Sequence, residues 1–289
     1  MPFAELNGVS IHYEATGTGT PLIFSHEFAG DSRSWKPQVE SFAGDFQCVT
    51  WNYRGFPPSE VPQDRSQYSQ DTLVEDLRAL MDHLEIDRAH VAGLSMGGSV
   101  TLHFAMKYPE RCLSAVVAGA GTGSSDRPQF EADIARIVEL LESRSMPEFA
   151  EIYAQAPTRT PFLEKDRAGW EQFREYLGQH STVGSANMMR EVQLKRPTIF
   201  SLESQLAQLE VPTLIIIGDE DEPCVEPAIF MRRKIPSSGL VVLPQSGHTI
   251  NLEEPELFNQ AIRSFLEMVE SGRWRTRGSV STSMMPSNE

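Results

Sequence analysis

Residues 93–97 read Gly-Leu-Ser-Met-Gly and join the apolar, strand-like run 89–94 to the helix-like run 98–108. A serine at such a corner is held on a tight turn, and the flanking glycines remove the Cβ atoms that would collide where strand and helix meet. The helix directs its N-terminal N–H groups at any anion that forms beside the serine. Ser95 is therefore a candidate nucleophile, and the Met96 N–H is a candidate oxyanion donor.

Glycine- and serine-rich turns are common, so this assignment depends on partner residues elsewhere in the chain. The apolar run 211–217 predicts a strand buried on both faces, and an acidic turn with Asp219 and Asp221 follows it. The shorter strand-like run 240–243 is followed by a loop that contains His248. Because parallel strands end at one edge of a sheet, a serine, an acid and a histidine in this chain order are expected to meet there.

These three residue types together perform nucleophilic catalysis. A serine hydroxyl is a poor nucleophile until a base removes its proton, and histidine titrates near neutral pH. A carboxylate then fixes the imidazole tautomer and stabilises the imidazolium. Since the nucleophile, the base and the acid are all side chains, the sequence predicts neither a metal site nor another cofactor.

On these motifs the chain resembles the α/β-hydrolase fold superfamily over about the first 120 residues and roughly residues 202–272. The most specific segments are the serine corner, the Ile-Ile-Ile-Gly-Asp-Glu-Asp turn and the Ser-Gly-His-Thr loop. The resemblance implies Ser95 as nucleophile, His248 as general base and acid, and Asp221 as orienting acid. Asp221 is preferred because the family places the acid three residues after the strand-ending glycine. Asp219 is then left for an Asx-type hydrogen bond to nearby backbone.

The second oxyanion donor departs from the family pattern, which has His-Gly and then an apolar residue. Here the segment reads His26-Glu27-Phe28, so the resemblance makes the Phe28 N–H the donor. A Cβ at Glu27 restricts the turn, and an unpaired carboxylate beside an oxyanion would oppose catalysis. We therefore favour a Glu27 side chain that points away into a polar network, towards Arg54 or Arg33. The alternative is that Glu27 binds a cationic or hydrogen-bond-donating substrate group, or positions a water.

The segment 52–59 is a second departure, because two prolines stand where relatives more often have a glycine and its neighbour. Proline fixes φ, so this loop is expected to be stiff. Arg54 in this loop is predicted to serve structure, by tying the loop to nearby carbonyl or carboxylate groups.

Periodicity predicts an α/β fold with a doubly wound, mainly parallel sheet and an inserted helical cap. Apolar residues at helical spacing predict an amphipathic helix over 69–85. Further strands are predicted at 8–15, 21–25, 46–51 and 113–118. We divide the chain into a first core segment (residues 1–123), a helical cap (124–200), a second core segment (201–271) and a tail (272–289) that is predicted to be disordered.

The cap is expected to cover the serine, exclude water and form the pocket that selects the substrate. Large side chains in it are candidates to line that pocket, together with Glu27: Tyr153, Trp170, Met188 and Met189. Such residues at helical spacing more often hold helices together, and we favour that interpretation for each one taken singly.

Composition narrows the classes of partner. The chain has 289 residues and a formal net charge of −15, which argues against nucleic acid and anionic membranes as partners and leaves a small-molecule substrate. The first residues lack the features of a signal peptide, and no apolar run reaches the length of a membrane span. The three cysteines, Cys48, Cys112 and Cys224, suit a reducing compartment. A cytoplasmic protein is therefore expected, and its oligomeric state is left open.

The leading hypothesis is a serine hydrolase that cleaves a small carboxylic ester or lactone through an acyl-enzyme intermediate. On the same fold, the alternatives are a C–C bond hydrolase of ring-cleavage products and a cofactor-free perhydrolase or haloperoxidase. An epoxide hydrolase or dehalogenase is disfavoured, because these need aspartate where Ser95 stands. From a different class, the fold also serves as a non-catalytic ligand receptor.

Overall fold

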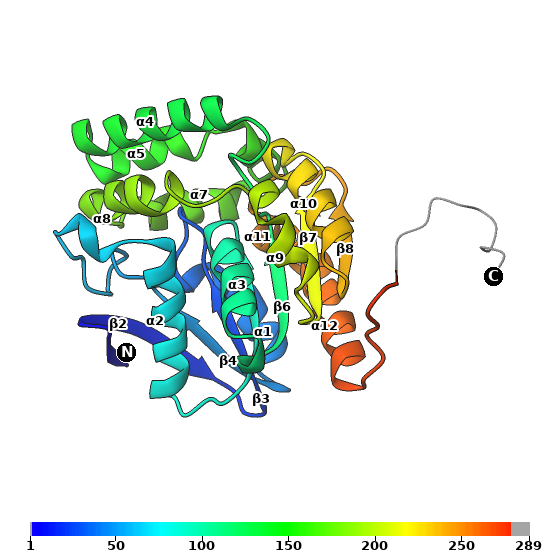
Figure 1. Cartoon of the computed structure of the whole chain (residues 1–289). Helices are drawn as coiled ribbons and strands as arrows, with labels where there is room; N and C mark the ends of the chain where they lie inside the picture. Colours follow the sequence, from blue (N-terminus) through cyan, green and yellow to red (C-terminus); the bar gives the residue numbers. More distant parts are fainter. Residues whose placement is uncertain (1, 279–289) are drawn as a thin grey trace.

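The computed structural model describes residues 2–278 and contains an eight-stranded sheet in the order β1-β2-β4-β3-β5-β6-β7-β8 (Figure 1). From β4 to β8 neighbouring strands are parallel, whereas β1 and β2 are antiparallel additions at one edge. The strands are β1 (Phe3–Leu6), β2 (Val9–Thr16), β3 (Thr20–Ser25), β4 (Phe46–Trp51), β5 (Ala89–Leu94), β6 (Cys112–Ala118), β7 (Thr213–Gly218) and β8 (Ser238–Leu243).

Apolar side chains cover both faces of the sheet. In β7, Leu214 and Ile216 pack into one core cluster, whereas Ile215 and Ile217 pack into the other. Successive side chains of a strand point to opposite faces, so an uninterrupted apolar run is what a doubly covered strand requires. The doubly wound, mainly parallel sheet that the sequence predicts is thereby confirmed.

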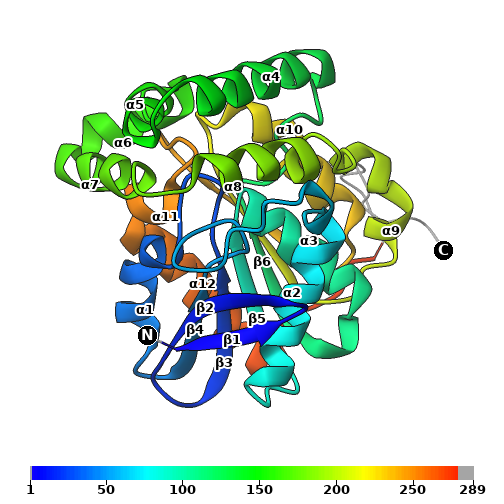
Figure 2. The same cartoon turned by 90° about the vertical axis from the view of Figure 1, so that its left-hand side faces the viewer.

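Helices cover the two faces separately, as Figures 1 and 2 show. On one face lie α1 (Lys36–Phe42) and α12 (Pro255–Glu270), and on the other lie α2 (Gln70–His83), α3 (Met96–Lys107) and α10 (Glu222–Lys234). The shorter helical segments of the core are η1 (Ser32–Trp35), η2 (Arg65–Gln67), η3 (Pro109–Arg111), η6 (Ile199–Leu202), α9 (Glu203–Ala207) and α11 (Ile250–Glu253).

Between β6 and β7 the chain forms a group of helices that lies above the carboxyl edge of the sheet (Figure 1). The first helix begins after Asp126, whose side chain accepts from the Gln129 N–H, and it buries Ile134, Val138 and Leu141 at helical spacing. These helices are α4 (Arg127–Ser143), α5 (Met146–Tyr153), η4 (Pro157–Arg159), α6 (Thr160–Lys165), α7 (Arg167–Leu177), α8 (Thr182–Asn187) and the π-helical turn η5 (Met188–Gln193). We call this group the cap; it lies inside the predicted range 124–200.

The strand order places a crevice at the centre of the sheet. Strand β3 pairs with β4 on one side and with β5 on the other, so the chain winds away from β3 in opposite directions. Ligands of open α/β sheets bind outside the carboxyl ends of strands at such a reversal. The two loops at this point begin with His26, after β3, and with Ser95, after β5.

Two features of the chain ends differ from the sequence-based expectation. The sequence does not predict strand β1, because four residues are too short for a clear alternation.

At the other end of the chain, the predicted disorder from 272 onward is wrong for 272–278. The Trp274 indole donates to the Ser237 carbonyl at 2.9 Å and packs on Phe265. The Arg277 N–H donates to the Pro236 carbonyl at 2.9 Å. Residues 279–289 lie outside the described region of the chain. No helix within residues 2–278 is long and apolar enough to span a membrane.

Arg54 has the structural role that the sequence predicts. Its guanidinium donates to both carboxylate oxygens of Asp76 in α2, at 2.7 and 2.8 Å, and to the Gln67 carbonyl at 3.0 Å. Arg54 and Asp76 are both buried. The pair therefore fastens the proline-containing loop to the helix beside it.

We expect Asp76→Ala to lower the free energy of unfolding by about 3–5 kcal/mol, because it leaves the Arg54 charge buried without a partner. Urea denaturation at neutral pH measures this change. Glu40→Ala is the control, since Glu40 makes an exposed i,i+4 pair with Lys36 and should leave the midpoint almost unchanged. Equal midpoints for the two variants would contradict the role given to Arg54.

Candidate active site

The turn between β5 and α3 holds Ser95 in an unusual backbone conformation, with φ +58° and ψ −111°. A Cβ added at Gly93 would lie 2.1 Å from the Gly97 carbonyl oxygen, and one at Gly97 would lie 1.9 Å from the Ser25 carbonyl oxygen. Only glycine fits at either position, because backbone occupies the space that a side chain needs. The close approach is what turns the serine out at the end of the strand.

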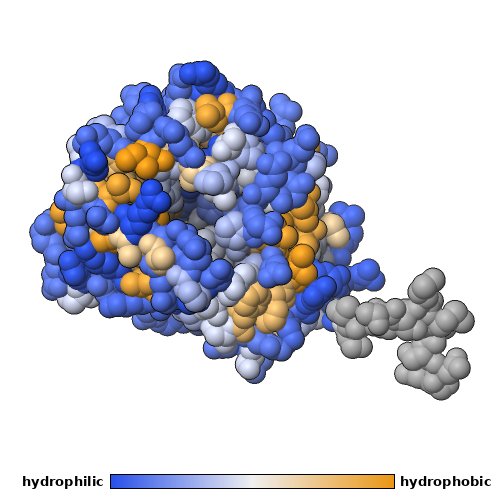
Figure 3. All heavy atoms as spheres, turned by 90° about the horizontal axis from the view of Figure 1, so that it is seen from above, coloured by the Kyte–Doolittle hydropathy of each residue, from blue (hydrophilic) through white to orange (hydrophobic). Residues whose placement is uncertain are grey.

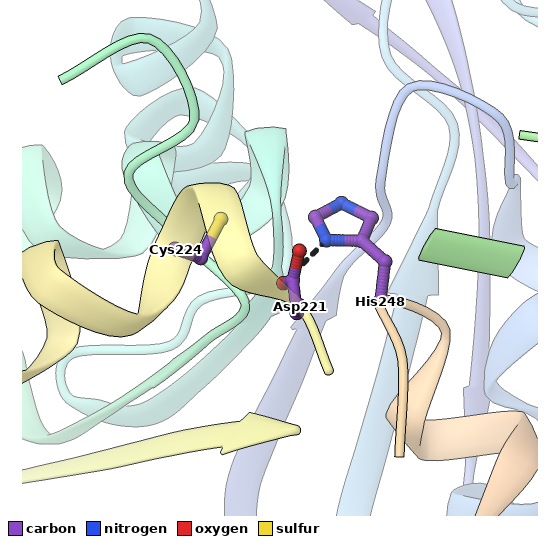
Figure 4. Close-up of side chains that lie close together, drawn as sticks. All are labelled: Asp221, Cys224 and His248. Atoms are coloured by element: carbon purple, nitrogen blue, oxygen red, sulfur yellow. Dashed lines mark hydrogen bonds and ion pairs between the residues drawn. The ribbon is translucent and has the colours of Figure 1, made fainter. Parts of the chain in front are cut away.

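The structure brings Ser95, His248 and Asp221 together in one hydrogen-bonded chain. The Ser95 Oγ lies 2.8 Å from His248 Nε2, and His248 Nδ1 lies 2.6 Å from Asp221 Oδ2. Figure 4 shows the imidazole beside the carboxylate, which comes from the start of α10. An ionised carboxylate can only accept, so we assign the ring proton to Nδ1, and Nε2 is then free to accept from the serine hydroxyl.

The two aspartates of the acidic turn have different surroundings. Asp221 is 1 % exposed and reaches the histidine, whereas Asp219 is exposed and accepts from the Ser246 N–H at 3.2 Å. The hydrogen bond of Asp219 goes to backbone, as expected, although to the loop before His248 rather than to its own turn.

Hydrogen bonds to the cap and to α11 hold the loop that carries His248. The His248 N–H donates to the Thr158 carbonyl in the cap at 2.9 Å, and the Gly247 N–H donates to a carboxylate oxygen of Glu253 at 2.9 Å. A Cβ at Gly247 would lie 2.3 Å from the Thr158 carbonyl oxygen. The orientation of the imidazole therefore depends on the cap as well as on the sheet.

The candidate oxyanion donors lie at the carboxyl ends of β3 and β5, which are neighbouring strands. Met96 is the first residue of α3, and the N–H groups of a first helical turn have no partner within the helix. Within residues 2–278 the Phe28 N–H donates to no other protein group. Both N–H groups are thus free to donate to a ligand, and the positive end of α3 favours an anion there.

Comparison with known proteins agrees with this architecture. The family model of the alpha/beta hydrolase fold matches residues 20–255. The chain belongs to this family. The 3-oxoadipate enol-lactonase 2 of Acinetobacter baylyi is 26% identical over 262 residues, covering 90% of this chain and 94% of the relative.

Solved structures of other family members superpose along most of this hydrolase-fold chain. A thermophilic esterase from Thermogutta terrifontis matches with a TM-score of 0.81 and 28% identity, covering 93% of this chain and 98% of the other. The enol-lactonase from Burkholderia xenovorans matches with a TM-score of 0.81 and 22% identity, covering 92% and 100%, a likeness that shows the fold alone.

In this hydrolase-fold protein, Glu27 lies in a buried ion pair with Arg159 of the cap. The two guanidinium ends donate to the two carboxylate oxygens at 2.8 and 2.5 Å, and Arg159 also donates to the Thr249 hydroxyl. The expected partners were wrong: Arg54 pairs with Asp76, and Arg33 pairs with Asp31. The correct partner is 132 residues from Glu27 along the chain, so no local pattern indicates it.

The charge of Glu27 is stabilised by its partner. Burial by itself would raise the pKa of this carboxyl, but the Arg159 charge and its hydrogen bonds outweigh burial and hold the pKa below its ordinary value of 4.5. The same pairing raises the pKa of Arg159. Glu27 does not line the pocket described below. Both oxygens of its carboxylate accept hydrogen bonds from Arg159 of the cap, which supports the interpretation that Glu27 belongs to a polar network.

A pocket of about 470 Å³ lies between the cap and the sheet, and both Ser95 and His248 line it. Tyr153 and Met189 line it as well, whereas Trp170 and Met188 do not. Trp170 donates its indole N–H to the Ala154 carbonyl at 2.9 Å and is buried inside the cap, as is Met188. Figure 3 looks down on the cap and shows hydrophobic side chains in separate patches on a largely hydrophilic face.

Several pocket residues were not singled out from the sequence. They are polar side chains of the cap, of the loop after β6 and of the segment after η5, where no motif marks them: Thr122, Gln155, Arg159, Gln193 and Arg196. Only their placement in three dimensions shows that they share a cavity with the serine.

Cys224 lies beside Asp221 and His248, and the three side chains are close enough to share an ion (Figure 4). The thiol contacts the Thr122 hydroxyl at 3.1 Å, and burial raises its pKa well above the ordinary value. Metal ligation needs a thiolate, and His248 Nδ1 already bonds the carboxylate. The donor set therefore fits the serine–histidine–aspartate chain better than a metal centre.

We expect Glu27→Gln to lower the free energy of unfolding by about 3–5 kcal/mol at pH 7, because Arg159 is left buried without its counter-charge. The pKa of Glu27 is depressed on folding, so its stabilisation is complete above the ordinary value of 4.5 and is lost as the pH falls through the lower folded value. The gap between wild type and Glu27→Gln should therefore narrow as the pH falls from neutral into the acid range below that ordinary value. Urea denaturation at a series of pH values measures it.

A double variant provides the control for this pair. Adding Arg159→Met to Glu27→Gln removes the unpaired charge and should recover some of the lost stability. A Glu27→Gln protein as stable as wild type, or a gap that widens in acid, would show that the ion pair does not hold the cap.

Proposed function

We propose that this protein is a serine hydrolase that cleaves a small carboxylic ester or lactone through an acyl-enzyme intermediate. The observation that carries the proposal is the hydrogen-bonded chain from Ser95 through His248 to the buried Asp221. Ser95 and His248 also line a pocket that a substrate can enter. A nucleophile, a base in reach of it and a group that orients the base are the requirements for this chemistry. The enol-lactonase and esterase names among the relatives agree with it.

In the acylation step, Ser95 Oγ attacks the substrate carbonyl carbon while its proton passes to His248 Nε2. Asp221 holds Nδ1 and stabilises the imidazolium. The carbonyl oxygen becomes an oxyanion, which accepts from the Phe28 and Met96 N–H groups. The C–O bond to the alcohol then breaks, and the alcohol oxygen takes the proton from Nε2.

In the deacylation step, water attacks the acyl-enzyme and gives its proton to His248 Nε2. The acid is released, and Ser95 Oγ recovers its proton from the imidazolium. With a lactone the alcohol stays attached to the acyl chain, so the product is a single hydroxy acid. Neither step consumes anything except water and the substrate.

The cap sets the size of the substrate. A pocket of about 470 Å³ suits a small molecule. Its apolar wall includes Phe28, Phe130, Ile134 and Tyr153, which exclude water from the serine when a substrate is bound. A screen of 4-nitrophenyl esters of increasing chain length, together with lactones, measures this size limit.

We expect Ser95→Ala to lower kcat by at least about 10³-fold, with the fold retained, because no other side chain replaces the nucleophile. A fluorophosphonate probe should label the wild-type protein and fail to label this variant. Ser99→Ala is the matched control: Ser99 lies in α3 one turn further on and does not line the pocket, so activity and labelling should persist. An intact wild-type protein that resists the probe would favour the non-catalytic receptor instead.

We expect Asp221→Asn to lower kcat by about 10³- to 10⁴-fold, because an amide no longer fixes the tautomer or stabilises the imidazolium. Asp219→Asn should leave kcat almost unchanged, since the one hydrogen bond that the Asp219 carboxylate makes within residues 2–278 comes from the Ser246 N–H and not from His248. Measuring kcat of both variants on the best ester of the screen shows which aspartate orients the histidine. The reverse ranking of the two variants would move the orienting role to Asp219.

A further inference from the structure

Arg196 differs from the other buried arginines of this chain. Arg54 and Arg159 are each 2% exposed, and each makes two hydrogen bonds to a single carboxylate. Arg196 is 8% exposed, and within residues 2–278 it forms no ion pair with a carboxylate. Within the same described range, the Arg196 guanidinium makes one hydrogen bond to a protein group, from Nη2 to the Thr122 carbonyl at 2.8 Å.

The Arg196 side chain lines the same pocket as Ser95 and His248. The segment that carries it is held in place, because the Arg127 guanidinium donates to the Leu194 and Arg196 carbonyl oxygens. The Phe130 ring lies 5.8 Å from the Arg196 guanidinium carbon and also belongs to the pocket wall. A cationic group is thus fixed at the wall, with some of its hydrogen-bonding capacity unused by the protein.

A buried charge without a counter-charge is unfavourable in the free protein. Burial lowers the pKa of the Arg196 guanidinium to about 10, so the group is still protonated at neutral pH. A ligand that brings a negative charge into the pocket removes this penalty. The planar fork of a guanidinium matches the two oxygens of a carboxylate, which makes a carboxylate the fitting group.

We propose that Arg196 binds a free carboxylate of the substrate, so that the preferred substrate is an ester or lactone that also carries an anionic carboxylate. This inference rests on the proposed hydrolase function and adds the charge of the substrate to it. Arg196 is then a specificity-determining residue that acts by binding, while bond cleavage stays with Ser95 and His248.

Two substrate series test the inference, because the carboxylate can lie on either side of the scissile bond. The first contains 4-nitrophenyl half-esters of succinate, glutarate and adipate, compared with neutral esters of equal chain length. The second contains acetyl esters of short hydroxy acids, compared with their amides. Rates are corrected with Ser95→Ala protein, since half-esters also cleave by intramolecular attack.

We expect the wild-type kcat/KM to favour the carboxylate-bearing member of at least one series by roughly 10- to 100-fold, the range for a hydrogen bond to a charged group. Arg196→Gln should remove this preference, mainly by lowering kcat/KM for the charged substrate. Arg196→Lys should retain some of it, because the charge remains but the fork is lost. Glutarate should inhibit cleavage of a neutral ester competitively in the wild type and less in Arg196→Gln.

Arg136→Gln is the matched control, since Arg136 lines the same pocket but is exposed. It should keep the preference. Fluorophosphonate labelling of Arg196→Gln shows whether its serine is still correctly placed. A wild type that cleaves neutral esters equally well, or a preference that is lost in Arg136→Gln and kept in Arg196→Gln, overturns the inference and leaves the hydrolase function intact. Failure to cleave any ester, with no labelling of the wild type, overturns both.

Discussion

The close approach of α3 to the ends of β3 and β5 determines the position of Ser95 at the carboxyl edge of the sheet. A Cβ at Gly97 would lie 1.9 Å from the Ser25 carbonyl oxygen, so any side chain there would separate helix and strand. The strained conformation of Ser95, of a kind that costs about 1–3 kcal/mol, is held by its N–H bond to the Ala118 carbonyl at 2.8 Å. The acid and histidine loops follow other strands of the same sheet, so sheet spacing sets their distance from this fixed hydroxyl.

The cap is held over that edge by buried charged groups as well as by apolar packing. Glu27 accepts two hydrogen bonds from Arg159, and Asp31 Oδ2 lies 3.2 Å from His180 Nε2. The loop after β3 therefore makes polar contacts with the cap through both carboxylates. Apolar faces tolerate sliding, whereas a bidentate ion pair has one geometry. We infer that these pairs set the register of the cap on the sheet, at a cost in desolvation that an apolar contact would avoid. The ion pair with the cap then accounts for a carboxylate at position 27, where the family pattern leads one to expect glycine.

The sequence predicts what depends on neighbours along the chain or on motif order. The run 211–217 predicts β7 (Thr213–Gly218) to within two residues at each end, because a strand covered on both faces must be apolar throughout. The order of the motifs along the chain is enough to predict that Ser95 and His248 lie at the same edge of the sheet. The partner of Glu27 and the position of Arg196 in the pocket depend on how the cap folds back, which periodicity does not encode. Trp170 shows the same limit of sequence-based prediction. The helical spacing of an aromatic residue in the cap fits a position in the pocket wall as well as a contact between helices.

The fixed cation in the pocket contrasts with the charge of the whole chain, which is −15. A net negative protein repels anions at long range, but exposed charges are screened beyond about 8 Å at physiological ionic strength. The Arg196 guanidinium is buried at the wall of the pocket, so its charge is screened much less. It acts on a substrate only after the substrate has entered the pocket. The acidic exterior therefore acts on the rate of encounter, whereas Arg196 and the Thr122 carbonyl that orients it act on which molecule stays beside the serine. Selection for an anionic group is thus compatible with an acidic surface, because the two effects operate over different distances.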